Sequence, residues 1–232
     1  MIKFLNNFFN KKITIDIDEQ ESRSTKFAET NNYLKKEIVV AVYKDKIDWL
    51  IDRKIKYNNL EKISAYNKFD RKDFDFVCKL PNIGRESHTY LYHIIKNYDN
   101  LADFTTFVQG NPLPHLHLYD NPSIDIFYFK SEPIHDFYAL GDFAMTNGMG
   151  RPFSHWDVDL FPIWEKLFYG DMPLRFFANY GAQFIASKDL IRSRSLKFYK
   201  ELMKCHEEYN HTPWALEIMW YFIFDPRYKS KI

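Results

Sequence analysis

The spacing of apolar residues predicts alternating strands and helices between residues 37 and 110. Short apolar runs rich in β-branched residues are typical of buried parallel strands, and apolar residues at i, i+3, i+4 and i+7 indicate one face of an amphipathic helix. The segments expected on these grounds are, in chain order, strand 37–43, helix 44–55, strand 62–68, helix 88–98 and strand 103–110. This order predicts an α/β domain with a mainly parallel central sheet, helices on both faces and right-handed crossovers.

The second half of the chain is less regular, with a proline-rich loop at 111–123 and a glycine-punctuated loop at 141–159. Helical and mixed patterns surround these loops, and Ser187 is suited to cap the helix that follows it. The segments expected here are helix 160–168, a strand that turns into a helix at 176–191, helix 195–209 with Leu196, Tyr199 and Met203 inward, and a mostly buried helix opened by Thr212 and Pro213.

Residues 1–36 stand apart from this pattern. Most of them are polar, whereas Ile2, Leu5 and Phe9 share one helical face. A segment of this kind packs on its own domain or on an oligomer partner, or it touches a membrane surface. We therefore expect an amino-terminal arm followed by one α/β domain at residues 37–232.

Composition supports a folded domain and narrows the classes of partner. Hydrophobic residues make up 46% of the chain, which is enough for a sizeable core. Lys and Arg (32) balance Asp and Glu (31), so the basic footprint of a nucleic-acid binder is absent from the sequence. The sequence holds no apolar run of about 18 residues, so no transmembrane helix is expected. Cys78 and Cys205 are read as reduced thiols, which favours a cytoplasmic protein, in contact at most with the inner face of the cell membrane.

Polar residues follow each of the first three expected strands, as YKD, YNK and QGNP. Ligands of parallel sheets bind at the carboxyl ends of the strands, and the helix after NIGRE starts from the same rim. Gly84 permits close approach of the backbone, free N–H groups at a helix start favour an anion, and Arg85 suits phosphate oxygens. The alternative is an ordinary helix start at which Arg85 and Glu86 form surface pairs.

The sequence patterns that could indicate metal ligands also have simpler explanations. Asp157 and Asp159 have the spacing of a carboxylate pair, but acidic residues are common at helix starts for electrostatic reasons. His115 and His117 lack further ligands at a recognisable spacing, so contact of His115 with substrate hydroxyls is the preferred interpretation. His155 is a further polar residue of an acceptor-side loop, or merely exposed.

Glu217 lies in WALEIMWYFIF, where nearly every neighbour is apolar. A carboxylate in such surroundings is buried with a partner or faces a cavity. Withdrawal from water raises the proton affinity of a carboxylate, which suits a general base that deprotonates a sugar hydroxyl. The alternative is a structural carboxylate bonded to an arginine or to a helix end. The sequence contains no G-x-S-x-G, P-loop or G-x-G-x-x-G motif, which argues against hydrolase, kinase and dinucleotide-binding functions.

Several of these stretches together resemble a domain family of unknown function found in bacteria, fungi and large DNA viruses. They are EIVVAVYKDKIDWL, AYNK, LPNIGRESHTYLYHIIKNYDNLADFTTFVQGNP, GAQFIASKDLIRSRSLKFYKEL and LEIMWYFIF, and the resemblance spans residues 37–225. Members of this family resemble nucleotide-sugar glycosyltransferases with the GT-A architecture, which is related to the Rossmann fold.

The resemblance implies roles for residues in four groups. Beside the base and ribose, and closing the nucleotide pocket, it places Tyr43, Asp45, Tyr66, Asn67 and Lys68. Near the diphosphate or the transferred sugar it places Asn82, Gly84, Arg85, Glu86 and His88. In the place that the metal motif has in the wider GT-A fold it puts Gln109, Gly110 and His115, and Asn111 is the second amide of this turn. Glu217 resembles the catalytic base of inverting enzymes with this architecture.

On this basis we expect transfer of a sugar from a nucleotide-sugar donor to a glycan acceptor, for instance in a bacterial capsule or lipopolysaccharide. Amides replace the Asp-X-Asp motif on the third strand, so use of Mn²⁺ or Mg²⁺ is open. Trp156 is a candidate for stacking on the acceptor. Two alternatives stay open: a non-catalytic carbohydrate- or nucleotide-binding module, and a metal-dependent hydrolase built on His115, His117 and Asp157.

Overall fold

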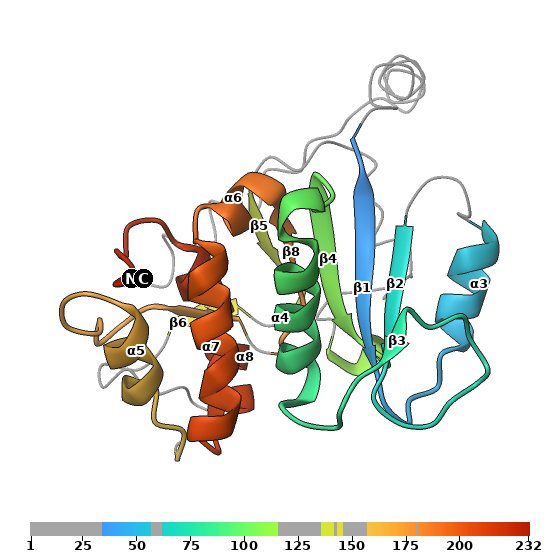
Figure 1. The fold of residues 1–232 in the computed structure, drawn as a ribbon, viewed down its shortest axis with the longest axis horizontal. Coiled ribbons are helices and arrows are strands. Elements are labelled where there is room, and N and C mark those ends of the chain that lie inside the picture. The colour runs from blue at the N-terminus through green and yellow to red at the C-terminus, as the bar shows by residue number, and fades with distance from the viewer. Residues whose placement is uncertain (1–33, 57–61, 116–135, 142, 146–156, 180) are drawn as a thin grey trace, which may run out of the picture. The chain divides into compact units, whose positions relative to one another are not determined.

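The protein is described by a computed structural model, shown in Figure 1. It describes the positions of residues 34–56, 62–115, 136–141, 143–145, 157–179 and 181–232. Nearly all of the expected amino-terminal arm lies outside these residues. None of the described helices is long and apolar enough to cross a membrane.

Six strands form a mixed, mostly parallel sheet in the order β3-β2-β1-β4-β8-β5 (Figure 1). β1 pairs in parallel with β2 and β4, β2 pairs in parallel with β3, and β8 is antiparallel to both β4 and β5. A second, two-stranded sheet joins β6 and β7. The strands are β1 (Lys36–Val42), β2 (Lys62–Asn67), β3 (Cys78–Lys79), β4 (Phe104–Gln109), β5 (Phe137–Ala139), β6 (Phe143–Met145), β7 (Phe177–Asn179) and β8 (Phe184–Ser187).

Helices pack against the sheet, and the two faces of β1 lie in different parts of the core. Side chains alternate along a strand, so Val39 and Ala41 join one apolar cluster while Val40 and Val42 join another. The first cluster includes residues of α4, α7 and α8, and the second includes residues of α3. The helices are α3 (Asp48–Lys56), α4 (Arg85–Asn97), α5 (Phe161–Leu167), α6 (Lys188–Arg192), α7 (Leu196–Glu208) and α8 (Thr212–Phe224), with 3₁₀ turns η1 (Tyr98–Asn100) and η2 (Leu113–His115).

The α/β class and the main elements predicted from the sequence are confirmed. Ser187 caps α6 as expected, with its Oγ accepting a hydrogen bond from the Leu190 N–H at 3.1 Å. The segment 176–191 was predicted as a strand that turns into a helix. Its helical part is α6, but its strand part is divided between β7 and β8, because the chain turns at Gly181 and Ala182, which both have positive φ. The short strands β3, β5 and β6 were not predicted.

The predicted inner face of α7 was partly wrong. Tyr199 is buried, but Leu196 and Met203 are only partly buried. The fully packed positions are instead Phe198, Tyr199, Leu202 and Cys205. The apolar stripe is therefore rotated by about one position from the one expected, because α4, α5 and α8 all contact this helix.

Candidate active site

The carboxyl ends of β1, β2 and β4 lie side by side. Ala41 is opposite both Tyr66 and Gln109 in the parallel register. Beyond the strand ends, Asp45 lies against Gly110, where an added Cβ atom would be 2.7 Å from the Asp45 Cγ. The Trp49 indole N–H also donates to the Gly110 carbonyl at 2.8 Å. The structure therefore brings together the strand tips that the sequence analysis placed at one rim.

Lys68 connects the tip of β2 to the start of α4. Its ammonium donates hydrogen bonds to the carbonyl of Ile83, at 2.5 Å, and to that of Arg85. Gly84 and Arg85 both have positive φ, at 62° and 47°, so the chain makes a tight left-handed turn around this ammonium. Lys68 is only 5% exposed, and burial lowers its pKa to about 8.

Two carboxylates from distant parts of the chain, Glu86 and Glu217, lie near this helix start. Glu86 is 7% exposed, and burial raises the pKa of its carboxyl group, with the negative charge of Glu217 acting in the same direction. Glu217 Oε1 accepts a hydrogen bond from the Gly181 N–H at 2.8 Å. The Tyr90 hydroxyl is influenced by both carboxylates, and burial raises its pKa strongly. Among the described residues, neither this hydroxyl nor Glu86 Oε1 has a hydrogen-bond partner.

Arg85 lies at the edge of this carboxylate pair. Its Nε is 3.6 Å from Glu86 Oε2, and its guanidinium carbon lies 5.6 Å from the centre of the Trp214 ring. The side chain is about half exposed. The pairing with Glu86 is thus present, as in the alternative interpretation, but Glu86 is buried, so the pair is not an ordinary surface pair.

Gln109 joins the tip of β4 to the loop that binds Glu217. Its side-chain amide donates to the Gly181 carbonyl at 3.0 Å, and its backbone N–H donates to Gln183 Oε1 at 3.3 Å. These bonds give Gln109 a structural part in placing the loop. Asn111 is exposed nearby, and the side chain of His115 lies outside the described residues.

A cavity of about 450 Å³ opens beside the tips of β1 and β2. Tyr43 stands next to it and makes an edge contact with Phe69, with ring centroids 5.4 Å apart. Phe69 and Arg71 were not predicted as site residues, although they directly follow the YNK tip. The lining residues are Lys44, Asp45, Lys46, Ile47, Asp48, Ile51, Phe69, Arg71 and Asp73.

Other predicted site residues support the rim without lining the cavity. Tyr66 is 2% exposed and its hydroxyl is 3.0 Å from His93 Nδ1, because strand alternation turns it toward α4. Both polar atoms of the Asn67 amide bond within the turn that follows: Nδ2 donates to the Arg71 carbonyl and Oδ1 accepts from the Phe69 N–H. The described contacts of Tyr66 and Asn67 are thus structural ones, and their expected role in closing a pocket stays a prediction.

Two further residues of the NIGRESH motif differ in exposure. Asn82 is exposed in the turn before α4. His88 is buried against His206 of α7, with ring centroids 5.9 Å apart, and burial lowers the pKa of His88 to about 4 and that of His206 to about 3. His88 therefore contacts α7 and does not line the cavity.

The weak metal candidates do not form a ligand set in the described structure. Asp157 and Asp159 are exposed, and Asp159 Oδ1 accepts a hydrogen bond from the Phe161 N–H at 3.0 Å, as expected for an acidic residue at a helix start. Among the described residues, no three His, Cys, Asp or Glu side chains are grouped so that they could hold a metal ion. His117, His155 and Trp156 lie outside the described residues.

The part of the chain that forms the rim matches the model of a known family. Residues 38–123 match the model of a family described as a protein of unknown function (DUF3431), which is less than half of the chain. The match spans β1 to η2 and so includes the NIGRE turn, but it does not reach Glu217. No curated protein and no solved structure matches the chain. Part of the chain is therefore similar to a family whose function is itself unknown.

Proposed function

We propose that this protein is a glycosyltransferase that moves a sugar from a nucleotide-sugar donor to a glycan acceptor. The observation that carries the proposal is the placement of two cationic side chains, Lys68 and Arg85, and two carboxylates, Glu86 and Glu217, near one rim of a mostly parallel sheet. Group transfer from a diphosphate needs positive charge for the leaving group and a base for the nucleophile.

The cavity beside the strand tips suits the nucleoside of the donor. Phe69 offers a ring face for the base, and Asp45 offers carboxylate oxygens to ribose hydroxyls. Lys68 and Arg85 stand at the adjacent helix start, where the diphosphate would lie. An ammonium has three donors, and the Ile83 and Arg85 carbonyls take two of them for Lys68.

The reaction we infer is a direct displacement with inversion. The acceptor hydroxyl oxygen forms a bond to the anomeric carbon while the bond from that carbon to the diphosphate oxygen breaks. Glu217 takes the hydroxyl proton, and the electron pair leaves with the diphosphate, whose charge is stabilised by Lys68 and Arg85. Glu86 keeps Arg85 in place through their ion pair.

A divalent metal fits the described residues poorly. Gln109 and Asn111 are amides, and the Gln109 amide is bound to the Gly181 carbonyl. We therefore assign the stabilisation of the diphosphate to the two cationic side chains.

Thermal denaturation with UDP, GDP and CDP, each with and without Mn²⁺, tests donor binding, because a ligand that binds the native state raises its melting temperature. We expect at least one nucleotide to stabilise the protein, and Arg85→Ala to reduce that shift. Arg192→Ala is the matched control, since Arg192 is an exposed arginine on α6 that stacks on Tyr98.

Turnover of a panel of nucleotide sugars separates the transferase from a binding module. Donor consumption that depends on Glu217 supports the transferase. Nucleotide binding without any turnover of the panel would instead favour the non-catalytic module, and equal shifts in wild type and Arg85→Ala would remove the diphosphate role of Arg85.

A further inference from the structure

Helix α8 is buried except along one stripe. Of its residues, only Trp214, Glu217 and Tyr221 are partly exposed, and their spacing of three and four places them on the same face. Tyr221 lies about 6 Å along the helix axis from Glu217, from the helical rise of 1.5 Å per residue. The proposed base therefore shares one partly exposed face of α8 with Trp214 and Tyr221.

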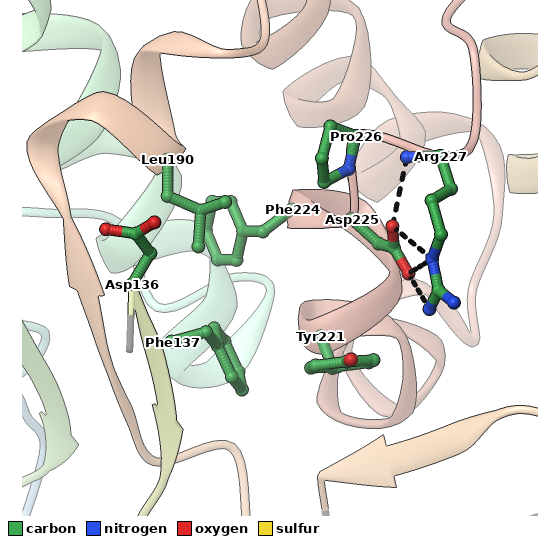
Figure 2. A pocket seen from close by; sticks show the side chains of 8 residues that line it. All are labelled: Asp136, Phe137, Leu190, Tyr221, Phe224, Asp225, Pro226 and Arg227. Carbon is green, nitrogen blue, oxygen red and sulfur yellow. Dashed lines mark hydrogen bonds and ion pairs between the residues drawn. The ribbon is translucent and has the colours of Figure 1, made fainter. Parts of the chain in front are cut away.

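At Tyr221 this stripe meets a second cavity, of about 340 Å³, at the C-terminal end of α8. Figure 2 shows the rings of Phe137 and Tyr221 on one side of it and the Asp225–Arg227 pair on another. The two rings meet edge to face with centroids 5.4 Å apart. The lining residues are Asp136, Phe137, Leu190, Tyr221, Phe224, Asp225, Pro226 and Arg227.

The polar side chains of this cavity are an ion pair, Asp225 with Arg227, and one exposed carboxylate, Asp136. Arg227 is held by Asp225, whose carboxylate accepts hydrogen bonds from the Arg227 backbone N–H at 3.0 Å and from its guanidinium. Asp136 is exposed at the edge of the cavity. Two carboxylates and one guanidinium leave a net charge of −1, which disfavours a phosphate and so a second donor site.

We propose that this cavity binds a neutral sugar unit of the acceptor glycan, one or two residues away from the hydroxyl that attacks. Aromatic rings provide flat apolar faces for the C–H groups of a sugar ring, while the carboxylates and the guanidinium match its hydroxyl groups. A short oligosaccharide can span the length of α8 between Glu217 and the cavity. The assignment to an acceptor rests on the proposed transferase, but the sugar site itself does not.

Saturation-transfer NMR with free glucose, galactose, mannose and N-acetylglucosamine as probes tests the site directly. We expect at least one hexose to bind the wild type, and Tyr221→Ala to weaken its binding about tenfold or more, as for loss of a central aromatic contact. Asp136→Asn should weaken binding too, and because Asp136 is exposed the change should leave the fold intact. Tyr169→Ala, at an exposed tyrosine outside the cavity, is the matched control and should bind normally.

Failure of the sugar site and failure of the transferase give different results. Absence of hexose binding, or equal binding by wild type, Tyr221→Ala and Asp136→Asn, overturns the sugar site, whatever the nucleotide results are. Hexose binding that these two variants lose, in a protein that binds no nucleoside diphosphate, leaves the sugar site standing and removes the transferase. Binding of both ligands, with nucleotide binding unchanged in Tyr221→Ala, supports both.

Discussion

Gly84 lies directly against His206: a Cβ atom added at Gly84 would be 2.7 Å from His206 Nδ1 and 2.8 Å from the Cβ of His88. From the sequence, this glycine was expected to let the backbone approach closely at an anion site. The structure shows that the close neighbour is α7, which packs against the first turn of α4. Glycine at this position therefore fixes how two helices meet beneath the candidate site.

Gly84→Ala should destabilise the protein more than Gly170→Ala. Both glycines have positive φ, which costs an alanine about 1–2 kcal/mol, but no atom lies within 4 Å of the position of a Cβ at Gly170. The clash with His206 should add about 1–3 kcal/mol to the cost at Gly84, as for overpacking. Denaturant unfolding of both variants measures the difference. Equal losses would show that His206 moves aside freely, and His206→Ala should reduce the excess in a double mutant, which keeps the close contact with the Cβ of His88.

Nucleotide affinity should fall as the pH rises above about 8. The Lys68 ammonium has a pKa of about 8 because it is buried, so its charge is lost in the unliganded protein above this pH. A diphosphate requires the charged form, and its binding constant should fall by up to tenfold per pH unit until the pKa of the complex is reached. Calorimetric titrations from pH 7 to 9.5 measure this slope. Lys68→Met should bind weakly at every pH, and an unchanged slope in that variant would exclude Lys68 as the source.

The protein should lose stability as the pH falls from about 6.5 to about 4. Burial lowers the pKa of His88 and His93 to about 4 and that of His206 to about 3, so the unfolded chain binds protons in this window while the folded protein does not. Stability is therefore full above pH 6.5 and declines below it. His93, beside Glu37, is the most enclosed of the three. The unfolding free energy of His93→Gln should fall less steeply with acid, and an identical pH slope would contradict the prediction.

Glu86→Gln should stabilise the protein at pH 7, by about 1 kcal/mol, as is common when a functional charge is removed. Burial and the charge of Glu217 raise the pKa of Glu86, so its ionised form opposes folding above its unfolded pKa, and the gain should vanish as the pH falls toward 4. Glu201→Gln is the control, since the Lys204 ammonium lowers the pKa of this more exposed carboxyl group and its loss should not stabilise. Melting curves at pH 7 and pH 4.5 measure both effects, and a lower melting temperature for Glu86→Gln at pH 7 would refute the prediction.

Glu217→Gln should lower the rate of sugar transfer by about 10²–10⁴-fold, the usual contribution of a general base. Nucleotide affinity should change little, because the proposed role of Glu217 is toward the acceptor hydroxyl. The side-chain oxygen of glutamine can still accept from the Gly181 N–H, so the loop should keep its position. Donor turnover and nucleotide titration on the same variant measure the two quantities. Full transfer activity in Glu217→Gln would show that another group is the base.

The sequence by itself determined the main elements and the class of the fold. The apolar runs that became β1, β2 and β4, the stripe of α4, and the Ser187 cap are local patterns, and their periods of two and 3.6 residues follow from backbone geometry. Because parallel strands share their carboxyl end, the convergence of Asp45, Lys68 and Gly110 at one rim could also be predicted.

Only the tertiary structure decided which polar side chains serve the packing and which serve the rim. Nothing local indicates that Gly84 accommodates His206, that the Gln109 amide binds the Gly181 carbonyl, or that the Gly181 N–H donates to Glu217. These pairs are far apart in the chain, so their contacts depend on how α7 and α8 pack against α4 and on the turn between β7 and β8. The partly exposed stripe from Glu217 to Tyr221 is likewise seen only in the tertiary structure. The other faces of α8 are buried by neighbouring elements, and its sequence, which is apolar nearly throughout, does not show which face stays open.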